Sequence, residues 1–135
     1  MSDQRLLVDG EAAGELVVLE EPLSFWGGLD AESGEIIDVR HPQLGTNIAG
    51  KIVAMAHGRG SSSSASVLAE AIRAGNGPSG IVLGEPDEIV VLGSLVAALL
   101  YETSCPVVVV DADVYGTLVS GDIAIISASG VVVQT

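Results

Sequence analysis

Short apolar runs separated by glycine, proline and serine mark out the elements of this chain. Two β-prone runs, at residues 6–8 and 16–19, lie on either side of a turn-forming stretch at 10–14, and together they predict a hairpin at the start of the domain. Prolines and paired glycines are frequent over residues 22–50, which predicts a long, ordered loop with one short strand at 35–39.

The middle of the chain alternates predicted strands with predicted helices. Three apolar runs have the length of buried strands, at residues 51–56, 81–83 and 107–110. A helical pattern follows the glycine- and serine-rich run that starts at Gly58, and it ends at Gly75. A second helical pattern begins at Pro86 and Asp87 and continues to about residue 101, interrupted by Gly93.

Two further strands are predicted at the end of the chain, at residues 123–126 and 131–133, and the serine–glycine turn between them favours antiparallel pairing. The resulting order is strand, strand, long loop, βαβαβ, strand, strand. This order predicts one α/β domain over residues 1–135, a β/α/β unit with a mixed sheet. No internal repeat or linker divides the chain.

The composition supports a folded domain and restricts its partners. The 135 residues include 18 acidic and 5 basic side chains, which give a formal net charge of −13 at pH 7, and the mean hydropathy is +0.54. This much apolar content excludes intrinsic disorder, and the acidity disfavours nucleic acid and anionic membranes as partners. With no leader pattern and no apolar run long enough for a membrane span, we expect a soluble, cytoplasmic protein.

The cysteine and histidine content limits the metal chemistry of this chain. Cys105 is the one cysteine, so the chain forms no internal disulfide and no four-thiolate site by itself, and we expect Cys105 to be a buried apolar residue. His41 and His57 are the two histidines, too few for a histidine-rich site. We expect His41 to bond to backbone, and His57 either to orient a substrate or to be an ordinary residue at a strand end.

The run GRGSSSSAS, residues 58–66, carries the most chemical information because it lies between a predicted strand and a predicted helix. Backbone N–H groups at a helix start bind anions where glycine leaves room, and here Arg59 adds positive charge and the serines add hydroxyl donors. The simpler interpretation is that Ser61 or Ser62 caps the helix and the remaining serines are a flexible tract. The run lacks the spacing of a Walker A or GxGxxG loop, which disfavours nucleotide binding.

Five blocks, in order and over nearly the whole chain, resemble the small subunit, or swivel domain, of the aconitase X family: PLSFWGGLD, GEIIDVRHPQLG, IAGKIV, GRGSSSSASVLAEAIRAG and PSGIVLGEPDEIVVLGSLVA. The resemblance implies a swivelling β/α/β domain of the aconitase type. It also implies a hydro-lyase in which a large partner subunit carries an iron–sulfur cluster, and in which this chain is inactive alone and holds no metal.

The resemblance also assigns roles to residues. In ordinary aconitases a serine from a Gly-Ser-Ser-Arg loop before a helix removes the proton next to a carboxylate, and by that pattern Ser61 is the expected base. No arginine follows the serines here, so Arg59 is expected to replace it. The expected substrate-binding residues are the rest of this loop and four residues that either line the mouth of the site or form an apolar plug over the sheet: Gly58, Arg59, Gly60, Ser62 and Ser63, with Phe25, Trp26, Gly27 and Gly28.

Dehydration of a β-hydroxy acid needs a base for the α-proton and a Lewis acid for the departing hydroxyl. This chain can supply only the base, and a serine serves as one only where positive charge and N–H dipoles favour its alkoxide. Within the family, the serine run is similar to bacterial enzymes that act on cis-3-hydroxy-L-proline, so we expect that substrate. The alternative is 5-phosphomevalonate, the substrate of archaeal members.

Two interpretations from other classes stay open at this point. Mobile β/α/β domains also carry phosphoryl groups, with His57 as the acceptor here. The chain can also be a non-catalytic interaction module whose acidic surface recruits a basic partner. The second helix, over residues 89–100, is more apolar than one core-facing side requires, so it either packs on a partner or lies under the terminal strands.

Overall fold

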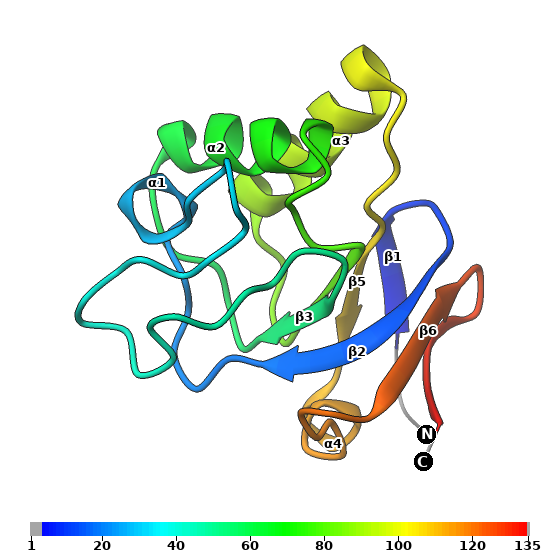
Figure 1. Ribbon diagram of the computed structural model, residues 1–135. Helices are drawn as coiled ribbons and strands as arrows, with labels where there is room; N and C mark the ends of the chain where they lie inside the picture. The colour runs from blue at the N-terminus through cyan, green and yellow to red at the C-terminus, as the bar shows by residue number, and fades with distance from the viewer. Residues whose placement is uncertain (1–3, 135) are drawn as a thin grey trace.

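In the computed structural model, which describes residues 4–134, the strands form one sheet in the order β1-β5-β4-β3-β2-β6-β7 (Figure 1). The four central strands are parallel: β2 (Ala12–Val18), β3 (Ile52–Met55), β4 (Gly80–Leu83) and β5 (Val107–Val110). The strands at both edges run antiparallel to their neighbours: β1 (Gln4–Val8) beside β5, and β6 (Ile123–Ser127) with β7 (Gly130–Gln134) beside β2. The expected α/β class and mixed sheet are confirmed.

The sheet curls until its two edges meet. The side chain of Gln4, in β1, accepts a hydrogen bond from the N–H of Val131, in β7, over 2.6 Å. Its amide also donates to the Val131 carbonyl over 3.3 Å. The two antiparallel additions therefore close one side of the parallel core, as the neighbouring positions of β1 and β6 in Figure 1 illustrate.

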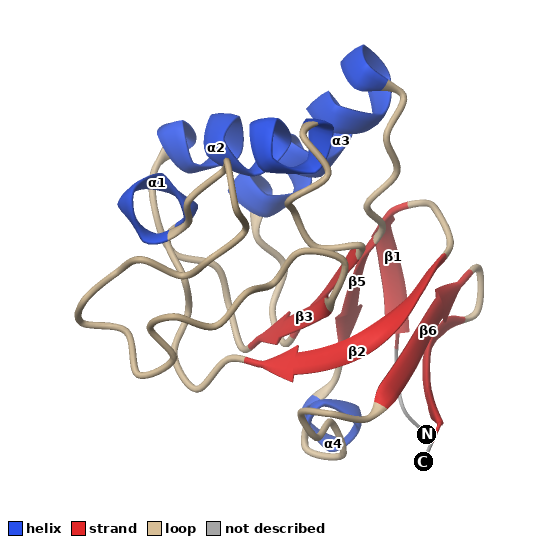
Figure 2. Cartoon of the chain, viewed as in Figure 1, coloured by secondary structure: helices blue, strands red, loops and turns tan. Residues whose placement is uncertain are grey.

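Two long helices cover the outer face of the sheet and lie side by side: α2 (Ser62–Arg73) and α3 (Glu88–Tyr101) (Figure 2). The parallel strands are buried on both faces, which explains their continuous apolar sequences. In β3, Val53 and Met55 belong to the core beneath the helices, whereas Ile52 and Ala54 belong to the core inside the curl. The expected strands in the middle and at the end of the chain, and both helices, are confirmed.

Two expectations about strands are wrong. β1 and β2 form no hairpin, since β1 pairs with β5 and β2 pairs with β3 and β6. An apolar pattern specifies that a segment is a strand but not its partner, and the curl keeps β1 close to the start of β2 without pairing them. Residues 35–39 also form no strand: Ile36 is buried, and Leu29–Ile36 and Glu35–Asn47 are isolated bridges within an ordered loop.

Two short elements were not expected from the sequence: α1 (Phe25–Gly28), a single irregular turn, and α4 (Ala112–Tyr115), which follows β5. Both have four residues, too few for a periodic pattern to reveal. In the part of the chain that the structure describes, no helix combines the length and apolar character that a membrane crossing requires.

α3 continues without a break through Gly93, which was expected to interrupt it. The glycine lies where α3 packs against α2. A Cβ atom at this position would be 2.9 Å from Leu68 Cδ2 and 3.0 Å from the carbonyl oxygen of Ala65. The missing side chain therefore sets how closely the two helices approach.

Substitution Gly93→Ala tests this packing. Alanine normally stabilises a helix relative to glycine, but here its methyl group overpacks the contact between α2 and α3, so we expect the free energy of unfolding to fall by about 1–3 kcal/mol. Urea denaturation monitored by circular dichroism measures the change. Leu99→Ala, at an exposed position of the same helix, is the control with little expected effect; a stabilised Gly93→Ala chain would contradict the account.

Candidate functional site

The carboxyl ends of the four parallel strands open onto one edge of the sheet, the usual position of ligand sites in α/β proteins. The segment after β2 leads to α1, the loop after β3 leads to α2, and the loop after β4 leads to α3. The serine run lies in the middle of this edge because β3 is a central strand. The fold therefore places the serine run, residues 58–66, at this edge with a neighbouring loop on each side.

Ser61 lies at the N-cap position of α2, in extended conformation with φ −101° and ψ −176°. Its side chain makes no capping hydrogen bond, so the simpler capping interpretation does not account for its hydroxyl. The side chains of Ser61, Ser62 and Ser63 are all exposed. The first turn carries no acidic residue, and its leading N–H groups have no carbonyl partner within the helix, so this end of α2 favours an anion.

Ser64, the fourth serine of the run, differs from the other three because it is fully buried. Its Oγ accepts a hydrogen bond from the backbone N–H of Trp26 and also bonds to Ser24 Oγ, each over 3.2 Å. Gly60 makes this arrangement possible with a φ of +115°, since a Cβ there would be 2.3 Å from Ser64 Oγ. The structure thus leaves Ser61, Ser62 and Ser63 as candidates for a base and removes Ser64.

The PLSFWGGLD segment lies directly beside the serine run, as expected, but only half of the four proposed mouth residues reach the surface. The Trp26 side chain is 64% exposed, and nothing lies within 4 Å of the position of a Cβ on Gly27. Phe25 is 1% exposed and packs in the core, and Gly28 is also buried. Phe25 and Gly28 therefore match the plug interpretation, whereas Trp26 and Gly27 match the mouth of a site.

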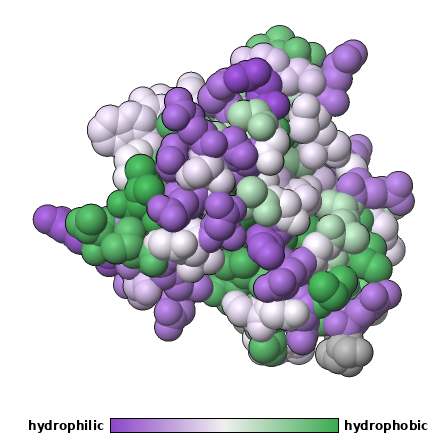
Figure 3. All heavy atoms as spheres, viewed as in Figure 1, coloured by the Kyte–Doolittle hydropathy of each residue, from purple (hydrophilic) through white to green (hydrophobic). Residues whose placement is uncertain are grey.

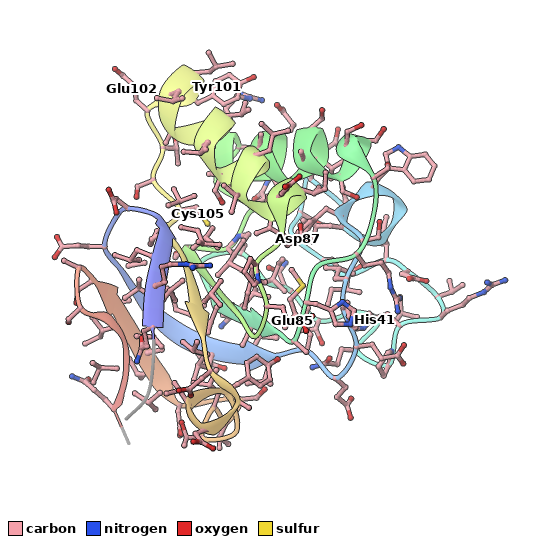
Figure 4. The ribbon with its side chains drawn as sticks, turned by 180° about the vertical axis from the view of Figure 1, so that it is seen from behind. His41, Glu85, Asp87, Tyr101, Glu102 and Cys105 are labelled. Carbon is pink, nitrogen blue, oxygen red and sulfur yellow. The ribbon has the colours of Figure 1, made fainter. Side chains whose placement is uncertain are left out.

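The start of α3 packs against the same loop at Gly58. Asp87 caps α3 by accepting a hydrogen bond from the N–H of Val90 over 2.9 Å. A Cβ on Gly58 would be 2.2 Å from the Asp87 carboxyl group, so glycine is required for this contact. Figure 4 shows Asp87 at the beginning of α3. The sequence predicted that Asp87 starts a helix but not that it lies beside the serine loop. The Pro-Asp pair that follows β4 was the signal from which this position could have been found.

The positively charged and imidazole groups of the loop are accessible. Arg59 is exposed, and its backbone forms a bridge with Ser24, which joins the two segments at main-chain level. His57 is exposed, and its Nδ1 lies 2.9 Å from the carbonyl of Gly58, so Nδ1 is the protonated nitrogen and donates. The site thus combines one guanidinium group, serine hydroxyls and a helix N-terminus.

His41 is buried and bonds to backbone, which confirms the expectation for it. Its Nδ1 accepts from the N–H of Gln43 over 3.1 Å, so its Nε2 carries the proton and donates to the carbonyl of Glu21 over 2.9 Å. His41 therefore holds the long loop against the end of β2.

The residues of this chain do not fit an iron–sulfur cluster. Among residues 4–134, no group of three or more histidine, cysteine or acidic side chains is placed to hold a metal ion. Cys105 is fully buried just before β5, and this burial raises the pKa of its thiol to about 12 (Figure 4). A neutral thiol in the core is not a ligand, so the described residues offer no thiolate to a cluster.

Exposed apolar side chains gather in two places besides the outer surface of β6 and β7, where Ile123 and Val132 are exposed. One is the tip of the long loop, where Figure 3 shows apolar atoms and where Ile37, Val39 and Leu44 are exposed. The other is α3, whose exposed side chains include Leu92, Leu95, Leu99 and Leu100. A groove of about 340 Å³ between α2 and α3 is lined by Ser62, Ser63, Leu92 and Val96, so the apolar surface of α3 is continuous with the serine run.

These features define an α/β fold that presents a serine-bearing helix N-terminus at the carboxyl edge of a curled mixed sheet. The chain belongs to the aconitase X swivel domain family, whose model matches residues 1–135. The crystal structure of aconitase X from Thermococcus kodakaraensis, in its holo form, superimposes with a TM-score of 0.86 at 31% identity and covers 99% of this chain and 98% of that one. The resemblance seen in the sequence blocks is confirmed.

Two types of relative have names that indicate an activity. The cis-3-hydroxy-L-proline dehydratase of Pseudomonas aeruginosa is 48% identical over 103 residues, 76% of this chain. The phosphomevalonate dehydratase small subunit of Thermococcus gammatolerans is 40% identical over 95 residues, 70% of this chain and 72% of that protein. The match covers only 18% of the Pseudomonas protein, so this chain corresponds to a small part of that relative's length.

The buried thiol predicts a loss of stability at alkaline pH. Because the pKa of Cys105 rises from 9.0 to about 12 on folding, its contribution is complete below pH 9 and is lost as the pH rises towards 12. Urea midpoints measured across this range should fall less steeply for Cys105→Ala than for the unsubstituted chain. Tyr115, whose pKa burial also raises, accounts for part of the decline that remains. Equal slopes for the two proteins would contradict the assignment.

Proposed function

We propose that this chain is the swivel-domain subunit of a cytoplasmic hydro-lyase, inactive alone and active with a large partner chain that carries an iron–sulfur cluster. The observation that carries the proposal is the start of α2. Three exposed serine hydroxyls surround this helix N-terminus, and its first turn has no acidic residue. Two kinds of dehydratase among the relatives support it. The relatives named as small subunits support a separate large partner chain.

In this proposal, the hydroxyl of Ser61 removes the proton from the carbon next to the substrate carboxylate. The N–H groups at the start of α2 and the guanidinium of Arg59 attract the carboxylate and also favour the alkoxide form of the serine. The cluster, when bound to the partner, supplies the Lewis acid that assists departure of the hydroxyl group. Trp26 and Gly27 form the wall of the site on the α1 side, and Ser62 and Ser63 add hydrogen bonds to the substrate.

Cis-3-hydroxy-L-proline is the proposed substrate, and 5-phosphomevalonate is the alternative. The higher identity to the hydroxyproline enzyme, 48% against 40%, favours the former. The charges of the loop agree with this choice, because residues 56–66 include one cation, Arg59, while the Asp87 carboxylate lies close by at Gly58. A single carboxylate suits that balance better than a carboxylate together with a phosphate. Assays of the reconstituted pair with each compound distinguish the two.

Ser61→Ala tests the catalytic assignment in the assembled enzyme. Loss of the base should lower kcat by about 10²–10⁴-fold with little effect on KM, because the hydroxyl acts in the proton transfer. Ser62→Ala and Ser63→Ala should reduce turnover far less. Near-normal turnover of Ser61→Ala beside an inactive Ser62→Ala enzyme would transfer the role to Ser62, and activity in all three variants would contradict a serine base.

The large partner is proposed to dock along α3. Contact with the serine run brings the partner to the groove between α2 and α3, and from there the apolar side chains of α3 continue to Leu99, which is 77% exposed. We expect Leu99→Glu to weaken association at least about tenfold, because it places an unpaired charge in an apolar contact. Titration calorimetry with the purified large chain measures this. Val132→Glu, on the exposed surface of β7, is the matched control; equal losses would contradict docking on α3.

A further inference from the structure

A closed ring of hydrogen bonds surrounds the peptide groups of Trp26. Its N–H donates to Ser64 Oγ, and the hydroxyl of Ser24 donates to its carbonyl, each over 3.2 Å. Because the Ser24 proton is used for that carbonyl, the bond between the two serine oxygens must be donated by Ser64. Each serine hydroxyl therefore both donates and accepts, an arrangement in which neighbouring hydrogen bonds strengthen one another.

Gly60 packs against the two hydroxyls of this ring. A Cβ on Gly60 would lie 2.3 Å from Ser64 Oγ and 2.8 Å from Ser24 Oγ, so a larger residue would push the two hydroxyls apart. Its φ of +115° is also a conformation that favours glycine. The same glycine immediately precedes Ser61. The bend that exposes the candidate base and the ring that holds Trp26 thus share one backbone position.

The burial of Ser64 contrasts with the exposure of the Trp26 side chain. Ser64 is fully buried, yet the Trp26 indole is 64% exposed, so packing of the indole into the core is not the reason for anchoring its backbone. A chain that only needed a stable core would gain little from fixing an exposed tryptophan. The ring fixes the backbone of Trp26 relative to the start of α2.

We propose that Ser24 and Ser64 are positioning residues, which hold the Trp26 indole and the Ser61 hydroxyl in one rigid arrangement at the substrate face. This inference rests on the proposed function, because it assigns Trp26 to the wall of that site. Neither serine touches the substrate. Loss of either hydroxyl loosens the contact between the α1 turn and the start of α2. This loss impairs proton transfer more than it weakens substrate binding.

Steady-state kinetics of the assembled enzyme provide the first measurement. We expect Ser64→Ala and Ser24→Ala each to lower kcat by about 10- to 100-fold while KM changes less than about threefold, because a misplaced base impairs the transition state more than binding. Ser127→Ala is the matched control. Ser127 and Ser129 form a similar pair of hydroxyls with a backbone N–H donor, far along the chain in the turn between β6 and β7, and this variant should keep normal turnover.

Fluorescence of the full chain alone provides the second measurement and does not depend on the proposed activity. Trp26 is the one tryptophan in the sequence, so its emission and its quenching by acrylamide report directly on this turn. Both ring variants should show faster quenching than the unsubstituted chain, and Ser127→Ala should not. Gly60→Ala should act in the same way, whereas Gly75→Ala, also at a positive φ but with open space around it, should not.

The combined results separate the two proposals. Faster quenching in the ring variants of the chain alone, together with an assembled unsubstituted enzyme that dehydrates neither substrate, would support the ring and overturn the proposed function. Unchanged quenching and unchanged kcat in folded Ser64→Ala and Ser24→Ala chains would overturn the positioning role. If Ser64→Ala does not fold, Ser24→Ala decides alone, because Ser24 is only partly buried and its loss leaves the core intact.

Discussion

One backbone bend, at Gly60, decides what this domain presents to its surroundings. Its positive φ and missing side chain turn Ser64 into the core and leave Ser61, Ser62 and Ser63 outside, at the start of α2. The outer serines then share a helix N-terminus without capping it, so their hydroxyls and the first N–H groups stay available to an anion. The chemistry proposed for the domain depends on this division of four identical side chains.

The parallel sheet places neighbouring loops beside the bend at Gly60. Because β3 and β4 run side by side in the same direction, the loops that follow them lie together, and Gly58 packs against the cap of α3 at Asp87. The irregular turn after β2 completes the edge from the other side. The domain contributes hydroxyls, one guanidinium group and helix dipoles, but its single thiol is locked in the core. The proposed dehydration therefore needs a Lewis acid that the described residues do not supply.

The sequence predicted the strands and helices that depend on neighbouring residues. It did not predict the strand pairing and side-chain contacts that join residues far apart in the chain. The βαβαβ centre follows from local apolar runs and glycines, and the five sequence blocks were sufficient to recognise the family. The partner of β1 was missed because strand pairing is decided across the whole sheet. The separation of Ser64 from the other serines was also out of reach, since it depends on Ser24 and the peptide of Trp26, about forty residues away.

Hydrogen–deuterium exchange of this chain, alone and mixed with the large chain proposed as its partner, tests most directly whether the serine-bearing edge binds that partner. The account predicts that assembly protects amides in residues 24–28, 58–66 and along α3, and leaves the hairpin of β6 and β7 unchanged. Protection confined to β6 and β7, with the start of α2 still exchanging freely, would contradict it.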